Sequence, residues 1–176
     1  MVVRHNGLMT LSEVVGDLFD AGLPAIGHGC NTKGAMGAGI AVEFRRRYPE
    51  MYREYRRRCA SGGFRLGEIF VWEAPDRIVY NLATQPRPGP SATVDAIRES
   101  VTRALVDAEV RGLAQLGVPR LGAGLGGLDW EAVRTALLEA STSSPVELVV
   151  VMRGTAGSGS EGPTRPSPGA GGTTQG

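Results

Sequence analysis

The chain has 176 residues, enough for one domain with a sizeable core. Its formal net charge is +1, so no overall field attracts nucleic acid or anionic lipid. No apolar run approaches the length of a membrane span, which excludes a membrane-spanning class. The two cysteines, Cys30 and Cys59, match no metal-binding or redox spacing. We therefore expect free thiols, no metal site and a cytoplasmic location.

In the first half of the chain, apolar patterning predicts two strands, at 10–15 and 24–30. A helix is expected from Gly39, with Ile40 and Phe44 on its apolar face. Pro49 permits a second helix to start there. The arginine triplets of this region, at 45–47 and 56–58, are interleaved with glutamates. A solvated helix surface is therefore favoured over nucleic-acid binding.

The second half of the chain continues the alternation of strands and helices. Strands are predicted at 66–72, 78–82, 116–118 and 146–152, and helices at 93–111 and after Asp129. Gly112 ends the first of these helices, and we interpret Asp129 as the cap of the second. Residues 84–90 form a proline-rich loop that cannot be a central strand.

About six strands with helices mostly between them predict an α/β fold with a largely parallel or mixed sheet covered on both faces. Ligands of such sheets bind beyond the carboxyl ends of the strands. From Gly154 onward Gly, Ser, Pro and Thr dominate, and such a composition cannot bury enough apolar area to offset the entropy of ordering. We expect a folded domain at 1–153 and a disordered tail at 154–176.

Two glycine-rich loops are the main functional signal. Residues 27–41 read GHGCNTKGAMGAGIA and residues 119–130 read PRLGAGLGGLDW. Each follows a predicted strand and precedes a predicted helix, an arrangement that directs backbone N–H groups and a helix N-terminus at an anion. A glycine turn before a surface helix is the alternative for a single loop. The presence of two loops in one small domain favours a diphosphate held from both sides.

These loops, together with Gly16-Asp17-Leu18-Phe19 and the residues 80–84, resemble the macrodomain, an ADP-ribose-binding module. The resemblance spans about residues 10–152 and implies a three-layer α/β/α sandwich. The branch that it resembles contains the terminal ADP-ribose protein glycohydrolase and the DarG antitoxin. ADP-ribose is then the ligand or product, and no cofactor is implied.

The resemblance also implies the residues that bind the ligand. Asp17 should accept a hydrogen bond from the adenine amine, and the two loops should wrap the diphosphate and the distal ribose. The full set is Asp17, Leu18, Asn31, Gly34, Ala35, Met36, Gly37, Ala38, Gly39, Ile40, Thr84, Pro119, Arg120, Leu121, Gly122, Ala123, Gly124, Leu125, Gly126 and Gly127.

Two departures from that branch concern catalysis. Gln85 stands where the branch has a lysine, and Gly126 stands where it has an aspartate in the second loop. Glutamine cannot form a Schiff base with the opened ribose, so hydrolysis here requires a positioned water. The catalytic candidates are Asn31, His28 and Gln85. For His28, which lies in an H-x-C-N run similar to that of the yeast ADP-ribose 1″-phosphate phosphatase, a general base and a structural residue on a buried strand both stay open.

The function expected from these features is a mono-ADP-ribosyl hydrolase. Its expected substrate is ADP-ribose in ester linkage to Asp or Glu of a protein, with nucleic acid as another modified target. A non-catalytic ADP-ribose reader is the first alternative, favoured by Gln85 and Gly126. A phosphatase acting on ADP-ribose 1″-phosphate is the second, favoured by His28. We expect a monomer that does not associate with membranes.

Overall fold

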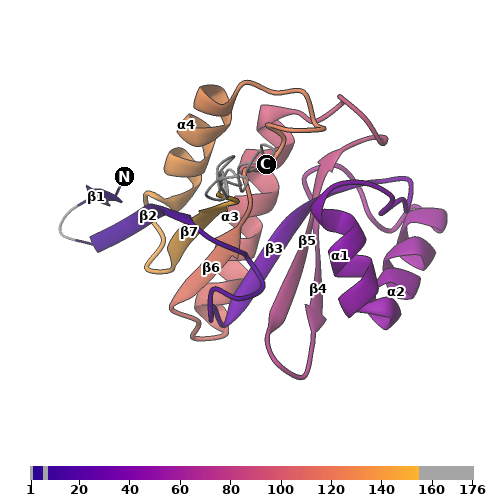
Figure 1. The fold of residues 1–176 in the computed structure, drawn as a ribbon, viewed down its shortest axis with the longest axis horizontal. Helices are drawn as coiled ribbons and strands as arrows, with labels where there is room; N and C mark the ends of the chain where they lie inside the picture. Colours follow the sequence, from indigo (N-terminus) through magenta and orange to yellow (C-terminus); the bar gives the residue numbers. More distant parts are fainter. Residues whose placement is uncertain (1, 6–7, 155–176) are drawn as a thin grey trace, which may run out of the picture.

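The computed structural model describes residues 2–5 and 8–154, and the expected tail beyond Gly154 lies outside them. Its strands form one sheet, and its helices lie between successive strands of the chain (Figure 1). The described strands are β1 (Val2–His5), β2 (Leu8–Val15), β3 (Ala25–Asn31), β4 (Ile69–Glu73), β5 (Ile78–Gln85), β6 (Gln115–Val118) and β7 (Glu147–Met152), and the described helices are α1 (Ile40–Arg47), α2 (Pro49–Ala60), α3 (Val94–Val110) and α4 (Trp130–Ser141).

The sheet has the strand order β1-β2-β7-β6-β3-β5-β4. Its interior pairs are parallel, whereas β1 pairs antiparallel with β2 and β4 pairs antiparallel with β5. The mixed sheet is therefore confirmed, with β1 as one strand more than the expected six. The residues of β1, VVRH, do not alternate between apolar and polar, so no local pattern indicated this strand.

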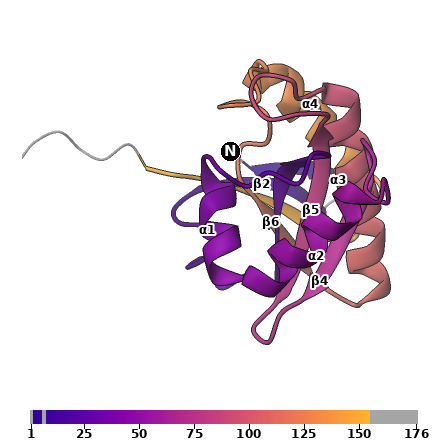
Figure 2. The same cartoon turned by 90° about the vertical axis from the view of Figure 1, so that its right-hand side faces the viewer.

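Helices cover both faces of the sheet, which confirms the three-layer sandwich. On one face, Ile97 and Val101 of α3 and Leu137 of α4 join a buried cluster with side chains of the central strands. On the other face, Phe44 of α1 and Tyr55 of α2 form the second cluster. Figure 2 shows α1 and α3 on opposite sides of the strands. The central strands are buried on both sides, as is typical of parallel sheets.

The helix ends follow the capping signals of the sequence. The Asp129 side chain accepts a hydrogen bond from the N–H of Ala132 at 3.2 Å, so its interpretation as the cap of α4 is confirmed. Gly112 follows α3 with a φ of 70°, a conformation that favours glycine. By contrast, Gly39 precedes α1 with a φ of 58°, and no side chain caps that helix. The Val42 N–H donates to the Gly39 carbonyl at 3.3 Å, and the N–H groups of Ile40 and Ala41 are thus left for another partner.

Two strand boundaries differ from the prediction by three residues. β4 begins at Ile69 rather than at residue 66, because residues 65–68 form a turn in which Glu68 N–H donates to the Arg65 carbonyl. β5 continues to Gln85 rather than ending at residue 82. As a result Thr84 and Gln85 belong to the strand end itself. The parallel strands β2, β3, β5, β6 and β7 all end at the same edge, where both glycine loops lie (Figure 1).

Candidate functional site

A cleft with two adjoining compartments lies at this edge of the sheet. The first compartment has a volume of about 1080 Å³ and lies at the ends of β2 and β7. The second has a volume of about 400 Å³ and lies at the ends of β3 and β5. The residues common to both come from the two glycine loops: Gly39, Ile40, Pro119, Arg120 and Gly124. The cleft can therefore hold one elongated ligand that passes between the loops.

The two loops meet at Gly39 and Leu125. A Cβ atom on Gly39 would lie 3.3 Å from Cδ1 of Leu125, whose side chain is 62% exposed. Backbone N–H groups of the uncapped α1 N-terminus begin at this point. A helix N-terminus beside a narrow passage is suited to an anionic group in the middle of the ligand.

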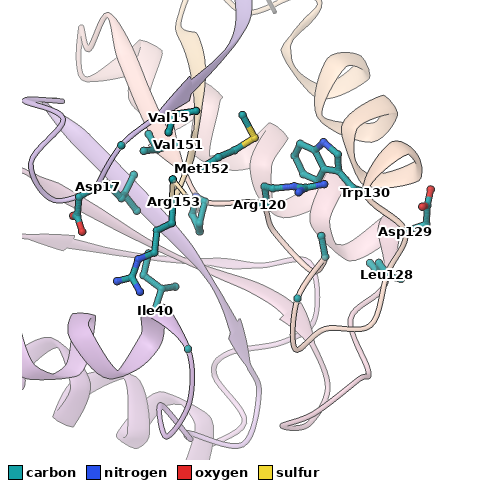
Figure 3. A pocket seen from close by; sticks show the side chains of 17 residues that line it. Val15, Asp17, Ile40, Arg120, Leu128, Asp129, Trp130, Val151, Met152 and Arg153 are labelled. Atoms are coloured by element: carbon teal, nitrogen blue, oxygen red, sulfur yellow. The ribbon is translucent and has the colours of Figure 1, made fainter. Parts of the chain in front are cut away.

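The first compartment combines apolar, acidic and basic side chains (Figure 3). Asp17 is exposed there, and its Oδ1 accepts from the N–H of Phe19 at 2.8 Å. Asp17 thus holds a turn after β2 and does not cap a helix. The Arg120 guanidinium lies 4.6 Å from the centre of the Trp130 ring, a cation–π contact on the opposite wall.

Sequence reasoning omitted Met152 and Arg153, which also line the first compartment. Figure 3 shows Arg153 on the side of Asp17 and Ile40. Both residues stand at the end of β7, which is parallel to β2 and β6. Their position follows from the topology, because parallel strands end at one edge, and not from any local motif.

The second compartment contains Asn31, whose side chain shapes the first glycine loop. Its Oδ1 accepts from the N–H groups of Lys33 and Ala35, at 3.0 and 3.2 Å. Its Nδ2 donates to the Ala35 carbonyl at 2.7 Å. The second hydrogen on Nδ2 has no acceptor among the described residues, and Asn31 lines the compartment. The amide therefore fixes the loop and keeps one donor for a ligand.

Gln85 occupies the wall of the second compartment at the end of β5. Its Nε2 donates to the carbonyls of Arg87 and Gly89, at 2.9 and 3.4 Å. Within the part of the chain that the structure describes, nothing donates to its Oε1. The side chain is thus held by the loop after β5 while its oxygen can accept a hydrogen bond from a water or a ribose hydroxyl.

His28 does not reach the cleft, and its expected role as a general base is wrong. Its ring is completely buried, stacks on Phe44 with 3.8 Å between ring centres, and bonds Oδ1 of Asn81 through Nε2 at 3.0 Å. Asn81 in turn donates to the Phe70 carbonyl at 3.1 Å, which links β3, β5 and β4. Of the two interpretations left open for His28, the structural one holds.

Burial lowers the pKa of His28 from 6.5 to about 4, against the raising effect of its bond to Asn81. Below pH 6.5 the unfolded chain binds a proton that the folded chain cannot take up, so stability falls as the pH drops toward 4. From the two pKa values we expect His28 to account for a loss of about 3 kcal/mol across this window.

His28→Gln, which keeps a donor for Asn81, should therefore lose less stability than the parent between pH 6.5 and pH 4. Urea unfolding at several pH values measures the difference. Parallel pH profiles for parent and variant would contradict a buried, neutral histidine.

Most of the binding set expected from the sequence lines one or both compartments, but Gly34, Met36 and Gly127 do not. Gly34 packs on α2, where its Cβ would lie 3.5 Å from Cα of Arg56. Met36 is 1% exposed and belongs to the core. Gly127 faces Pro90, 2.8 Å from a Cβ at that position. The contribution of these three residues is to hold the loops in place.

Position 126 cannot accept an aspartate in this loop conformation. A Cβ on Gly126 would lie 2.7 Å from both Cα and the carbonyl oxygen of Gly122, and 2.9 Å from Cβ of Ala92. Real Cβ atoms do not approach backbone so closely. The glycine at this position is therefore required by the packing of the loop.

The chemistry available in the second compartment is neutral or cationic. Its polar side chains are Asn31, Thr84, Gln85 and Arg120, and no residue that lines it is acidic. Across residues 2–5 and 8–154 no group of three or more His, Cys, Asp or Glu side chains could hold a metal ion. The compartment can orient a ligand and a water, but it offers no side chain to deprotonate that water.

The family model named Macro domain matches residues 28–137. The DNA ADP-ribosyl glycohydrolase of Mycobacterium tuberculosis is 36% identical over 138 residues, which are 74% of this chain and 38% of that protein. The ADP-ribose 1″-phosphate phosphatase of Candida albicans is 32% identical over 144 residues, 73% of this chain and 92% of that protein. The solved macrodomain of M. tuberculosis DarG has a TM-score of 0.74 and 32% identity, and the match covers 82% of this chain and 98% of that structure.

The chain belongs to the macrodomain family. It spans 38% of the length of the curated glycohydrolase that it matches, so that protein extends well beyond the shared domain. In the part of this chain that the structure describes, no helix has the length and apolar character needed to cross a bilayer.

Proposed function

We propose that this chain binds ADP-ribose and hydrolyses the bond that joins it to a modified protein. The observation that carries the proposal is the two-compartment cleft with a helix N-terminus at its narrow passage. A nucleoside in the first compartment, a diphosphate at the passage and a ribose in the second match this shape. Relatives named as a DNA ADP-ribosyl glycohydrolase and an ADP-ribose 1″-phosphate phosphatase support the binding of ADP-ribose and the hydrolase class, while the protein target is part of the proposal.

The proposed chemistry uses a positioned water and no covalent intermediate. Oε1 of Gln85 accepts from the water, and Nδ2 of Asn31 donates to a hydroxyl of the distal ribose. The water oxygen bonds to the anomeric carbon as the bond to the carboxylate oxygen breaks, and the carboxylate departs as an anion. The water's proton passes to solvent, because the compartment has no acidic residue to receive it. An ester suits this site because its leaving group requires little protonation, so alignment supplies most of the rate enhancement.

The test is incubation of the protein with peptides that carry mono-ADP-ribose in ester linkage to Glu or in ether linkage to Ser. We expect slow release of ADP-ribose from the ester only, and no adduct after borohydride reduction. Lys33, the single lysine, lines neither compartment. A trapped adduct would contradict the water mechanism, and equal turnover of both linkages would contradict the argument from the leaving group.

A non-catalytic reader is the second candidate. The features that favour it are Gln85, Gly126 and the lack of an acidic residue on the walls of the second compartment. Binding of ADP-ribose without turnover of any linkage would establish this alternative. Phosphatase action has lost its main support, because His28 is buried away from the cleft. The monomeric state, the cytoplasmic location and nucleic acid as a modified target stay predictions.

A further inference from the structure

Four cations lie on segments next to the second compartment, and we call Lys33, Arg45, Arg56 and Arg87 the basic rim. All four are exposed. None of them has a carboxylate partner among the described residues. They come from three separate segments: the loop after β3, the helices α1 and α2, and the loop after β5 (Figure 1). The proposed binding and hydrolysis of ADP-ribose involve none of these four residues.

Hydrogen bonds and packing bring these segments together. Thr32 donates from its N–H to the Gln85 carbonyl and from Oγ1 to the Pro86 carbonyl, both at 3.1 Å, so Lys33 and Arg87 stand on adjacent loops. In the sequence, Lys33 is flanked by Asn31 and Ala35, and both of these line the compartment. Arg87 is likewise flanked by Gln85 and Pro88, which line it too. The rim therefore borders the place where the distal ribose and its attached target would emerge.

Helices α1 and α2 supply the other two cations beside the same loop. Arg56 lies under Gly34, since a Cβ on that glycine would be 3.5 Å from Cα of Arg56. Arg45 stands one helical turn beyond Ala41, which lines the compartment. The guanidinium groups of Arg45 and Arg56 both lie near the Tyr52 ring, 5.3 and 5.9 Å from its centre. Both cations thus lie beside the same aromatic ring.

The remaining five arginines of α1 and α2 are ion-paired, and they share three glutamates. Ion pairs with Glu43, Glu50 and Glu54 engage Arg46, Arg47, Arg53, Arg57 and Arg58. The cations without a carboxylate partner thus form a compact patch, whereas the other arginines of the two helices are interleaved with acidic side chains. A nucleic-acid backbone, with a phosphate at every step, favours an extended track, whereas a few carboxylates on a flexible peptide fit a compact patch.

We propose that the basic rim docks an acidic segment of the target protein next to the ADP-ribosylated side chain. This inference rests on the proposed function. It defines the substrate class as Asp- or Glu-rich sequence around the modified carboxylate, which would meet four unpaired cations and no acidic residue on the compartment walls. Such exposed charges act mainly on association and on KM, and salt screens them.

The test compares two peptides with one ester-linked mono-ADP-ribose each, one with acidic flanks and one with neutral flanks. We expect the acidic peptide to have a lower KM at low salt and a similar kcat, with the difference lost in about 0.5 M NaCl. Lys33→Gln/Arg56→Gln should raise the KM of the acidic peptide by about 5-fold to 20-fold, if each cation contributes up to about 1 kcal/mol. The neutral peptide and free ADP-ribose should be unaffected.

Arg103→Gln is the matched control, because it removes one exposed cation from α3 in the opposite layer. It should leave all these values unchanged. Equal KM values for the two peptides, or an equal effect of Arg103→Gln, would overturn the basic rim as a docking site. Tighter binding of an ADP-ribosylated oligonucleotide of matched charge would overturn the choice of an acidic peptide.

Binding of the same peptides, measured by calorimetry, separates this inference from the proposed function. A preference for acidic flanks without any turnover would support the basic rim and reject the hydrolase. Turnover without that preference would support the hydrolase and reject the basic rim as a docking site.

Discussion

Gly124→Val is expected to abolish ADP-ribose binding while leaving the melting temperature of the free protein unchanged. Apart from its two chain neighbours, no described residue lies within 4 Å of a Cβ at position 124, and Gly124 lines both compartments. The added side chain would therefore occupy the passage proposed for the diphosphate without a clash at its Cβ. We expect affinity to fall on the order of 10²-fold or more, which corresponds to about 2.7 kcal/mol.

Two further substitutions make this prediction specific. Gly37→Val should behave like Gly124→Val, since position 37 is equally open and lines the second compartment. Gly126→Val should instead lower the melting temperature, because its side chain would meet the backbone of Gly122. Thermal shift with and without ADP-ribose measures both effects, because a ligand stabilises only the state that binds it. Normal stabilisation of the position 37 and 124 variants by ADP-ribose would contradict the two-loop site.

Asn31→Ala is expected to reduce turnover of ester-linked ADP-ribose by a factor on the order of 10². The variant loses the donor proposed for the ribose and the three hydrogen bonds that hold residues 31–35. It should also unfold more easily, by about 2 kcal/mol, because two backbone N–H groups lose their acceptor. Single-turnover kinetics and titration with free ADP-ribose separate these effects, and the loss in turnover should exceed the loss in affinity.

Tyr55→Phe is the control for the structural part of this effect. The Tyr55 hydroxyl donates to the Asn31 carbonyl at 2.5 Å and lies 3.3 Å from Oδ1 of the same residue. Its removal should lower stability, while the bonds of the Asn31 amide to Lys33 and Ala35 stay in place. If Tyr55→Phe reduced turnover as much as Asn31→Ala, the role of Asn31 would be loop support alone.

Local patterns predicted most of the fold. The helices around Ile97 and Val133 showed clear apolar faces and capping residues, and both are present. The ends of β4 and β5 were not predicted, because they depend on pairing between the two strands. The Glu68 carbonyl accepts from the N–H of Ala83, a contact between distant segments that no local period reveals.

The candidate site was predicted less evenly. The two glycine-rich loops are recognisable from their composition and from their position between a strand and a helix. Most of their residues line the cleft, as predicted. The role of His28 could not be predicted because alternate residues of a strand point to opposite faces of the sheet. Only the assembled layers show that Phe44 covers the face on which His28 lies. Arg153 was not predicted because it follows an apolar strand and belongs to no motif, although it lines the cleft.

The close approach of Gly126 to Gly122 restricts the order in which mutations can accumulate in this lineage. An acidic residue at position 126 is incompatible with a neighbour whose carbonyl oxygen lies 2.7 Å from the new Cβ. The loop backbone must move first, through changes near Gly122 or Ala92, and only then can position 126 acquire a carboxylate. A directed-evolution experiment that starts from this sequence should therefore recover an acidic residue at 126 only in combination with earlier substitutions in the loop.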